Sequence, residues 1–170
     1  MKKQGLYNPL FEHENCGAGF ICSLKGKKTN DIISKALNIL TCLEHRGAVS
    51  SDGRTGDGAG ILIEIPDIFF KKECKFSLPE FKEYAVGMVF LPPKKNQLNY
   101  CVDIFEEEIK RQGLNILGWR EVPVNSKVVG AIASQSQPNI KQDFIGKNDP
   151  NQTEKDFLLR LYISRKISVS

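Results

Sequence analysis

The chain has 170 residues, of which 41% are hydrophobic and 26% charged, a composition typical of a soluble globular domain with one core. Its net charge of +4 comes from scattered lysine pairs without a long block of like charge, so we expect neither a nucleic acid nor a membrane as partner. The sequence also lacks a long apolar span, a signal peptide and closely spaced cysteine pairs, which predicts a cytoplasmic protein without disulfides or a metal cluster.

The first half of the chain contains one strongly periodic segment. In residues 31 to 44 the apolar side chains recur every three or four positions, which predicts an amphipathic helix with Thr29 or Asn30 at its N-cap. The expected elements of this half are, in order, an irregular leader (1–15), a buried strand (16–24), this helix (31–44), a central strand (58–66) and a short helix (67–73).

The second half mixes strands and helices without strict alternation. The expected elements are a strand (84–91), a helix (97–112) that ends at Gly113, three strands (116–124, 128–133 and 140–145), a loop (146–153) and a helix (154–167). Because several strands follow one another between helices, the pattern favours an α+β protein over a strictly alternating parallel-sheet protein. Two sheets covered by helices fit this count of elements.

The strongest chemical signal is Cys16, which is followed by the small residues Gly17, Ala18 and Gly19. So little bulk beside the sulfur would let a substrate carbonyl approach closely. The alternative is a buried structural cysteine in a tightly packed strand. An ordinary thiol has a pKa near 8.5 and is mostly protonated at neutral pH, so a nucleophilic Cys16 needs an activating base.

Three further motifs follow Cys16 along the chain: His45-Arg46-Gly47-Ala48, Thr55-Gly56-Asp57-Gly58-Ala59-Gly60-Ile61-Leu62 and Gly118-Trp119-Arg120-Glu121-Val122-Pro123-Val124. In this order and spacing, the chain from Leu6 onward resembles the N-terminal part of the class II glutamine amidotransferase domain of the glutamate synthase large subunit. The resemblance implies the four-layer αββα fold of the N-terminal-nucleophile hydrolases, incomplete in this chain. Residues 1 to 15 would be a propeptide and residues 16 to 170 the first portion of the domain.

The resemblance also implies a mechanism. Removal of the leader would make Cys16 the first residue, so that its own α-amino group, with a pKa of about 7.7 to 8.0, takes the thiol proton. Cys16 would then attack the side-chain amide of L-glutamine, release ammonia and form a γ-glutamyl thioester that water hydrolyses. Arg46 is implied as a second active-site residue. Its alternative is a surface arginine stabilised by the dipole at a helix C-terminus.

Two competing interpretations carry less support. His13 and His45 are rival bases, but His13 lies in the leader and His45 is expected to orient the loop that carries Arg46. The glycine-rich run 56–60 is a poor dinucleotide site, because a loop precedes it and a strand is expected after it. Close backbone packing beside the Cys16 strand, which the resemblance implies, is the better explanation of these glycines.

The sequence departs from the family in one respect. The resemblance implies an oxyanion hole built from an Asn-Gly pair, and this chain contains no Asn-Gly dipeptide. We therefore expect a glutaminase segment that would supply ammonia for reductive amination of 2-oxoglutarate, with little activity in the chain alone. The alternative is a non-catalytic remnant that serves assembly or regulation.

The implied cofactors and partners belong mostly to other parts of the enzyme. We expect no cofactor in this segment, whereas FMN and an iron–sulfur cluster are implied for the full-length enzyme. The implied partners are L-glutamine, the synthase domain of the same polypeptide and a small NAD(P)H-dependent subunit.

Overall fold

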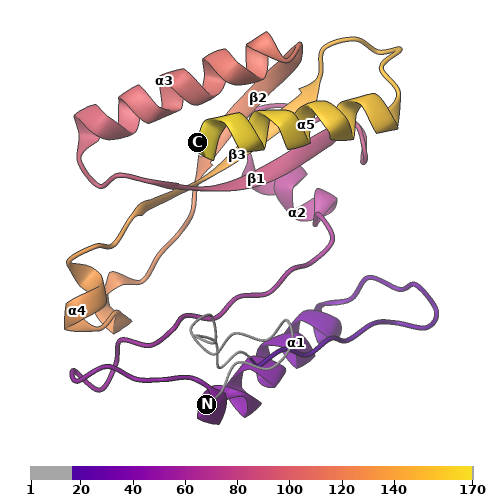
Figure 1. The fold of residues 1–170 in the computed structure, drawn as a ribbon. Helices are drawn as coiled ribbons and strands as arrows, with labels where there is room; N and C mark the ends of the chain where they lie inside the picture. Colours follow the sequence, from indigo (N-terminus) through magenta and orange to yellow (C-terminus); the bar gives the residue numbers. More distant parts are fainter. Residues whose placement is uncertain (1–16, 170) are drawn as a thin grey trace, which may run out of the picture. The chain divides into compact units, whose positions relative to one another are not determined.

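The structure, a computed structural model, describes residues 17–169, with side chains through Ser168, and divides them between two compact units. Unit 1 is the described part of Met1–Glu64 together with Lys127–Gln135, and unit 2 is Ile65–Ser126 together with the described part of Ser136–Ser170. The two units therefore interleave along the chain (Figure 1).

Unit 1 is built around helix α1, Asn30–Cys42. The predicted amphipathic helix is confirmed, and Thr29 is its N-cap residue with an extended backbone, although its side chain forms no capping hydrogen bond. The apolar face is only half-buried, because all of the described core residues lie in unit 2. Unit 1 also contains the short 3-10 helix η2, Glu44–Arg46, and helix α4, Ala131–Ser134.

Two strands predicted for unit 1 are wrong. Residues 17–23 and 58–66 lack strand structure, and the only β-bridge among the described residues of the unit joins Val49 to Gly56. Both runs are rich in apolar residues with high strand propensity, but a strand also needs a hydrogen-bonded neighbour. Without one, Phe20 and Leu62 are 91% and 100% exposed.

Unit 2 contains an antiparallel sheet of three strands, β1 (Tyr84–Leu91), β2 (Leu114–Glu121) and β3 (Asn139–Lys147), in the order β1-β3-β2. The three strands predicted for this part of the chain are confirmed. The first was predicted over residues 84 to 91, which are the bounds of β1. The helices and antiparallel strands confirm the α+β class. A single sheet is present within residues 17–169, so the second sheet of the implied four-layer fold is not found there.

Three helices cover the two faces of this sheet (Figure 1). Helices α3 (Lys95–Arg111) and α5 (Glu154–Val169) lie side by side over one face, where they complete a hydrophobic cluster formed by Ile109, Leu114, Ile145 and Phe157. The short helix α2, Asp67–Glu73, lies on the opposite face. All three helices were predicted, with bounds that differ by one or two residues at most for α3 and α5.

The face under α2 is closed by aromatic rings around Phe144 of β3, which is fully buried. The ring of Phe70 meets that of Phe144 edge-on, with 5.0 Å between centroids, and the ring of Phe76 does so at 5.3 Å. Such edge-to-face pairs contribute about 0.5–1.5 kcal/mol beyond the burial of their area. Phe144 on the central strand is therefore the centre of the aromatic contacts under α2, and the Tyr84 hydroxyl of β1 adds a hydrogen bond to Asp67 of this helix at 2.9 Å.

The strand predicted over residues 128–133 is also wrong. The 3-10 helix η3, Ser126–Val128, and helix α4 occupy this stretch, and α4 begins after Gly130. The amides of Ile132 and Ala133 donate to side chains of residues 52 and 55, which a local reading of the sequence does not reveal. Long-range hydrogen bonds have overridden a local preference for strand.

The most unusual core residue is Asp143, on the central strand β3 beside Phe144. Its carboxylate is completely buried, and neither oxygen has a hydrogen-bond partner among the described residues. Its neighbour on β1 is Gly87, where even a single Cβ would collide with the Asp143 carboxylate. Burial raises the pKa of Asp143 from 3.8 to about 6. The backbone N–H groups of Asp143 and Gly87 lie near enough to oppose this rise, although neither forms a hydrogen bond of normal geometry with the carboxylate.

We expect Asp143→Asn to stabilise the fold at pH 8 but not at pH 4. Because the folded-state pKa lies above 3.8, the stabilisation from protonation is complete below pH 3.8 and is lost as pH rises through 6. Each pKa unit corresponds to about 1.4 kcal/mol, so removing the charge should add up to about 3 kcal/mol at pH 8. Urea denaturation of the wild type and the variant at both pH values measures the difference.

The matched control is Asp103→Asn, which removes an exposed carboxylate from α3. It should change the free energy of unfolding by less than about 0.5 kcal/mol at either pH. An equal gain for Asp143→Asn at pH 4 and pH 8 would show that Asp143 is not charged in the folded protein.

Candidate active site

Cys16, the predicted nucleophile, lies outside the described residues, and so does His13. The described chain begins at the next residue, Gly17, which packs against the end of α1. A Cβ placed on Gly17 would lie 3.0 Å from Leu43 Cδ2 and 3.4 Å from Arg46 Cβ. The residue that follows Cys16 therefore lies close enough to Arg46, the second predicted site residue, that an added methyl group would touch it.

The small residues after Cys16 have a packing role in the structure. A Cβ on Gly19 would lie only 2.6 Å from Ile39 Cγ2, so the absence of a side chain lets segment 17–19 approach α1 closely. Sequence reasoning assigned these glycines to substrate access. The structure adds the requirement that the segment after Cys16 lie against the helix that leads to Arg46.

Arg46 is the last residue of η2 and is exposed. Its backbone N–H donates to the carbonyl of Leu43 at 2.8 Å, which fixes the turn that follows α1. In the preceding residue, His45 Nδ1 lies 3.0 Å from the carbonyl oxygen of Cys42. Because a carbonyl only accepts, this bond requires the proton on Nδ1, and it ties the imidazole ring to the turn at the end of α1.

The loop after Arg46 contains a carboxylate that sequence reasoning missed. Asp52 accepts hydrogen bonds from the backbone N–H of Arg54 at 3.0 Å and of Thr55 at 2.8 Å, and from the Thr55 hydroxyl at 2.6 Å. The Ile132 N–H of α4 donates to the same carboxylate at 3.1 Å. The Thr55 hydroxyl bond, with these amide bonds, lowers the pKa of Asp52 well below its usual range.

Asp52 and Thr55 therefore cap a helix almost eighty residues away in the chain. Thr55 Oγ1 accepts the Ala133 N–H at 3.2 Å, beside the bond from Ile132 to Asp52. Gly130 precedes α4 and lies so close that a Cβ there would be 2.6 Å from the Thr55 backbone nitrogen. Asp followed by Gly, as in Asp52-Gly53, is typical of a turn in which the Asp side chain accepts from the backbone two residues on, so the sequence contained a signal for the turn but not for its distant helix.

The glycine-rich run 56–60 does not form a nucleotide-binding turn, since no helix follows it before α2. A Cβ on Gly56 would lie 3.3 Å from the Ala48 carbonyl oxygen. The expected close packing is present, but it is against the chain just after Arg46 rather than beside a Cys16 strand.

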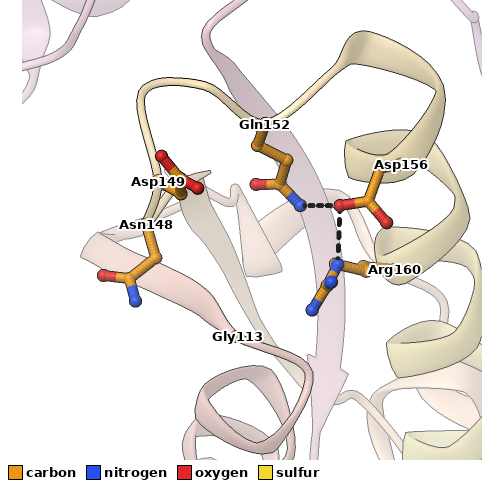
Figure 2. A pocket seen from close by; sticks show the side chains of 6 residues that line it. All are labelled: Gly113, Asn148, Asp149, Gln152, Asp156 and Arg160. Atoms are coloured by element: carbon orange, nitrogen blue, oxygen red, sulfur yellow. Dashed lines mark hydrogen bonds and ion pairs between the residues drawn. The ribbon is translucent and has the colours of Figure 1, made fainter.

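A pocket in unit 2 offers a different kind of site, shown in Figure 2. Its lining residues are Gly113, Asn148, Asp149, Gln152, Asp156 and Arg160. The polar groups largely satisfy one another, because the Asp156 carboxylate accepts from Gln152 Nε2 at 2.7 Å and from Arg160 Nε at 2.8 Å. Arg160 Nη1 also donates to the Gln112 carbonyl at 2.7 Å. The hydrogen bonds of these lining residues thus connect the start of α5 to the end of α3, and none of the lining residues is a nucleophile.

The described part of the chain also contains other thiols and residues of metal-ligating types. The four described cysteines, Cys22, Cys42, Cys74 and Cys101, are free thiols, and burial raises the pKa of Cys74. Between residues 17 and 168 no group of three or more His, Cys, Asp or Glu side chains could hold a metal ion. The described helices include none with the length and apolar character needed to cross a membrane.

Comparisons with known proteins agree on one family. Residues 16–170 match the family model described as glutamine amidotransferases class-II. The chain is 46% identical to the glutamate synthase (NADPH) large chain of Bacillus subtilis. The matched region covers 97% of this chain and 11% of that protein. The chain is 42% identical to the glutamate synthase (NADH) of Saccharomyces cerevisiae, covering 96% of this chain and 8% of that protein. The chain therefore spans about a tenth of the length of these relatives.

We expect Asp52→Ala to release α4 from the loop. Loss of the carboxylate removes the acceptor of the Ile132 N–H and frees the Thr55 hydroxyl to rotate away from the Ala133 N–H. Hydrogen exchange at Ile132 and Ala133 should speed up by about tenfold or more, whereas exchange in α1 should not change. Unchanged exchange at both amides would contradict the capping role of Asp52.

Proposed function

This chain belongs to the class II glutamine amidotransferases, and from that premise we propose that it is part of a glutaminase site with Cys16 as nucleophile and Arg46 beside it. The observation that supports the proposal is how little space separates Gly17, which is bonded directly to Cys16, from Arg46: a Cβ on Gly17 would lie 3.4 Å from Arg46 Cβ. Two motifs separated by about thirty residues in the sequence thus meet at the end of α1.

The proposed reaction begins with cleavage of the bond between Asn15 and Cys16, which leaves a free α-amino group on Cys16. This amine takes the thiol proton, and Sγ attacks the side-chain carbonyl carbon of glutamine. The ammonium proton then passes to the amide nitrogen as the C–N bond breaks, so that ammonia leaves and a γ-glutamyl thioester remains. Water, deprotonated by the same amine, attacks the thioester, releases glutamate and restores the thiol.

Arg46 is suited to hold an anionic part of the substrate. Its side chain is exposed, and no described residue is seen to accept a hydrogen bond from its guanidinium. A guanidinium offers a planar fork of donors that matches a carboxylate, such as the one that glutamine carries on its Cα. We propose that Arg46 binds this carboxylate and so places the side-chain amide at Cys16.

The fate of the ammonia is proposed from the relatives. They are glutamate synthases, so the ammonia released at Cys16 would be used by a synthase domain for reductive amination of 2-oxoglutarate. FMN and the iron–sulfur cluster would act in that synthase domain, and a small NAD(P)H-dependent subunit is a proposed electron source. Residues 16 to 170 are assigned no cofactor in this proposal.

We expect processing to remove residues 1 to 15. The test uses a chimera of the Bacillus subtilis glutamate synthase large chain in which this chain replaces the segment it matches. Intact mass should show a protein that begins at Cys16, and Cys16→Ala should abolish glutamine hydrolysis. A chimera that hydrolyses glutamine while keeping its leader would refute the N-terminal-nucleophile mechanism. A processed but inactive chimera would favour the non-catalytic alternative.

We expect Arg46→Ala in the same chimera to lower glutamine-dependent turnover by about 100-fold, because the substrate loses a charged anchor. Synthesis of glutamate from added ammonia should be largely unaffected, since it bypasses Cys16. Arg46→Lys should restore only part of the turnover, because lysine lacks the planar fork of donors. An equal loss of both activities would point to misfolding instead.

A further inference from the structure

The loop that follows Arg46 forms a hydrogen bond with a second carboxylate, that of Asp57. We infer that Asp57 is a positioning residue, which fixes the backbone conformation from which the Arg46 side chain reaches the substrate. The inference rests on the proposed role of Arg46. Asp57 is exposed and stands between Gly56 and Gly58, so it adds little to hydrophobic packing. Its carboxylate accepts a hydrogen bond from the backbone N–H of Ala48, two residues after Arg46.

On its N-terminal side, Arg46 is held by the turn at the end of α1. The N–H of Arg46 donates to the Leu43 carbonyl at 2.8 Å, and the N–H of Gly47 donates to the Glu44 carbonyl at 3.1 Å. The backbone then becomes extended at Gly47, with φ −93° and ψ 156°. Helical bonds therefore stop at Gly47, and Ala48 has the first amide that another segment must hold.

On its C-terminal side, the chain is held by the segment that carries Asp57. Asp57 Oδ2 accepts the Ala48 N–H at 2.8 Å, and the adjacent pair Val49 and Gly56 forms an antiparallel bridge. The lack of a side chain at Gly56 lets the segment approach the Ala48 carbonyl closely. Asp57 thus closes the ladder at the end nearest to Arg46.

Position matters here because the Arg46 side chain is exposed. A long exposed side chain is directed mainly by its own backbone, and a misplacement of about 1 Å at a substrate-binding group can reduce turnover about 100-fold. The Asp57 carboxylate oxygen accepts the Ala48 N–H at 2.8 Å, only two residues after Arg46. Asp57 is therefore the residue best placed to keep residues 46–48 in one conformation when substrate binds.

The test compares three substitutions at position 57 in the chimera with the Bacillus subtilis protein. Asp57→Asn keeps an oxygen for the Ala48 N–H and should retain most of the turnover. Asp57→Glu keeps the charge but moves the acceptor by one methylene, and Asp57→Ala removes it. Both should lower glutamine-dependent turnover by about 10- to 100-fold and raise the KM for glutamine, while ammonia-dependent synthesis stays unchanged.

Hydrogen exchange at the Ala48 amide provides a readout besides activity. Exchange should speed up by about tenfold or more in Asp57→Ala and Asp57→Glu, while amides within α1 keep the wild-type rate. The control variant is Asp103→Ala, which removes an exposed carboxylate from α3 and should change neither exchange at Ala48 nor turnover. If Asp57→Ala does not fold, the turnover of Asp57→Asn compared with that of Asp57→Glu still separates the effect of the acceptor's position from the effect of its charge.

The outcomes distinguish this inference from the proposed function. If Arg46→Ala lowers turnover but Asp57→Glu and Asp57→Ala leave turnover and Ala48 exchange unchanged, the positioning role is overturned while the glutaminase site stands. Loss of turnover in Asp57→Asn equal to that in Asp57→Ala would overturn it too, because the charge alone would then matter. If Arg46→Ala has no effect on glutamine turnover, the proposed site itself fails.

Discussion

The pairing of β3 with both of its neighbours is the constraint on which unit 2 depends. Strand β3 provides backbone hydrogen bonds to β1 along one edge and to β2 along the other. Its alternating side chains serve both faces, with Phe144 under α2 and Ile145 under α3 and α5. Because the same strand supplies the pairing and the centre of both hydrophobic clusters, a change in its register would expose both at once.

Unit 1 is held together in a different way. Its helix α1 has no fully buried residue, and its long-range order comes largely from polar contacts of loop residues such as Asp52, Thr55 and Asp57. Exposed hydrogen bonds of this kind contribute less than a buried core does, but they are directional. They define where the backbone lies around Arg46 more than they stabilise the unit.

The elements predicted correctly are those whose structure is decided locally. Helix α1 follows from apolar spacing, and β1 follows from an apolar run that ends at a proline pair. The strands expected over residues 16–24 and 58–66 failed because strand propensity does not provide a neighbouring strand. Residues 128–133 failed because side chains far away in the sequence cap α4.

The candidate site shows the same division. Arg46 was singled out from the motif in which it occurs, whereas Asp57 was quoted in a motif but given no role, and Asp52 was passed over as a loop residue. Their partners, Ile132 and Ala48, donate backbone amides, which leave no signature in the sequence. The buried Asp143 was missed for a related reason, since its burial depends on the absence of a side chain at Gly87 across the sheet.

The interleaving of the two units has a consequence for synthesis on the ribosome. The hydrogen bond between the Asp52 carboxylate and the Ile132 amide cannot form until Ile132 has been synthesised, 80 residues after Asp52. At about 5–20 residues per second, that delay is roughly 4 to 16 s, and by its end β1, α3 and β2 have already been translated. During this interval the Asp52 turn exists without the helix it caps. Completion of unit 1 is therefore set by the rate of translation as well as by its own folding.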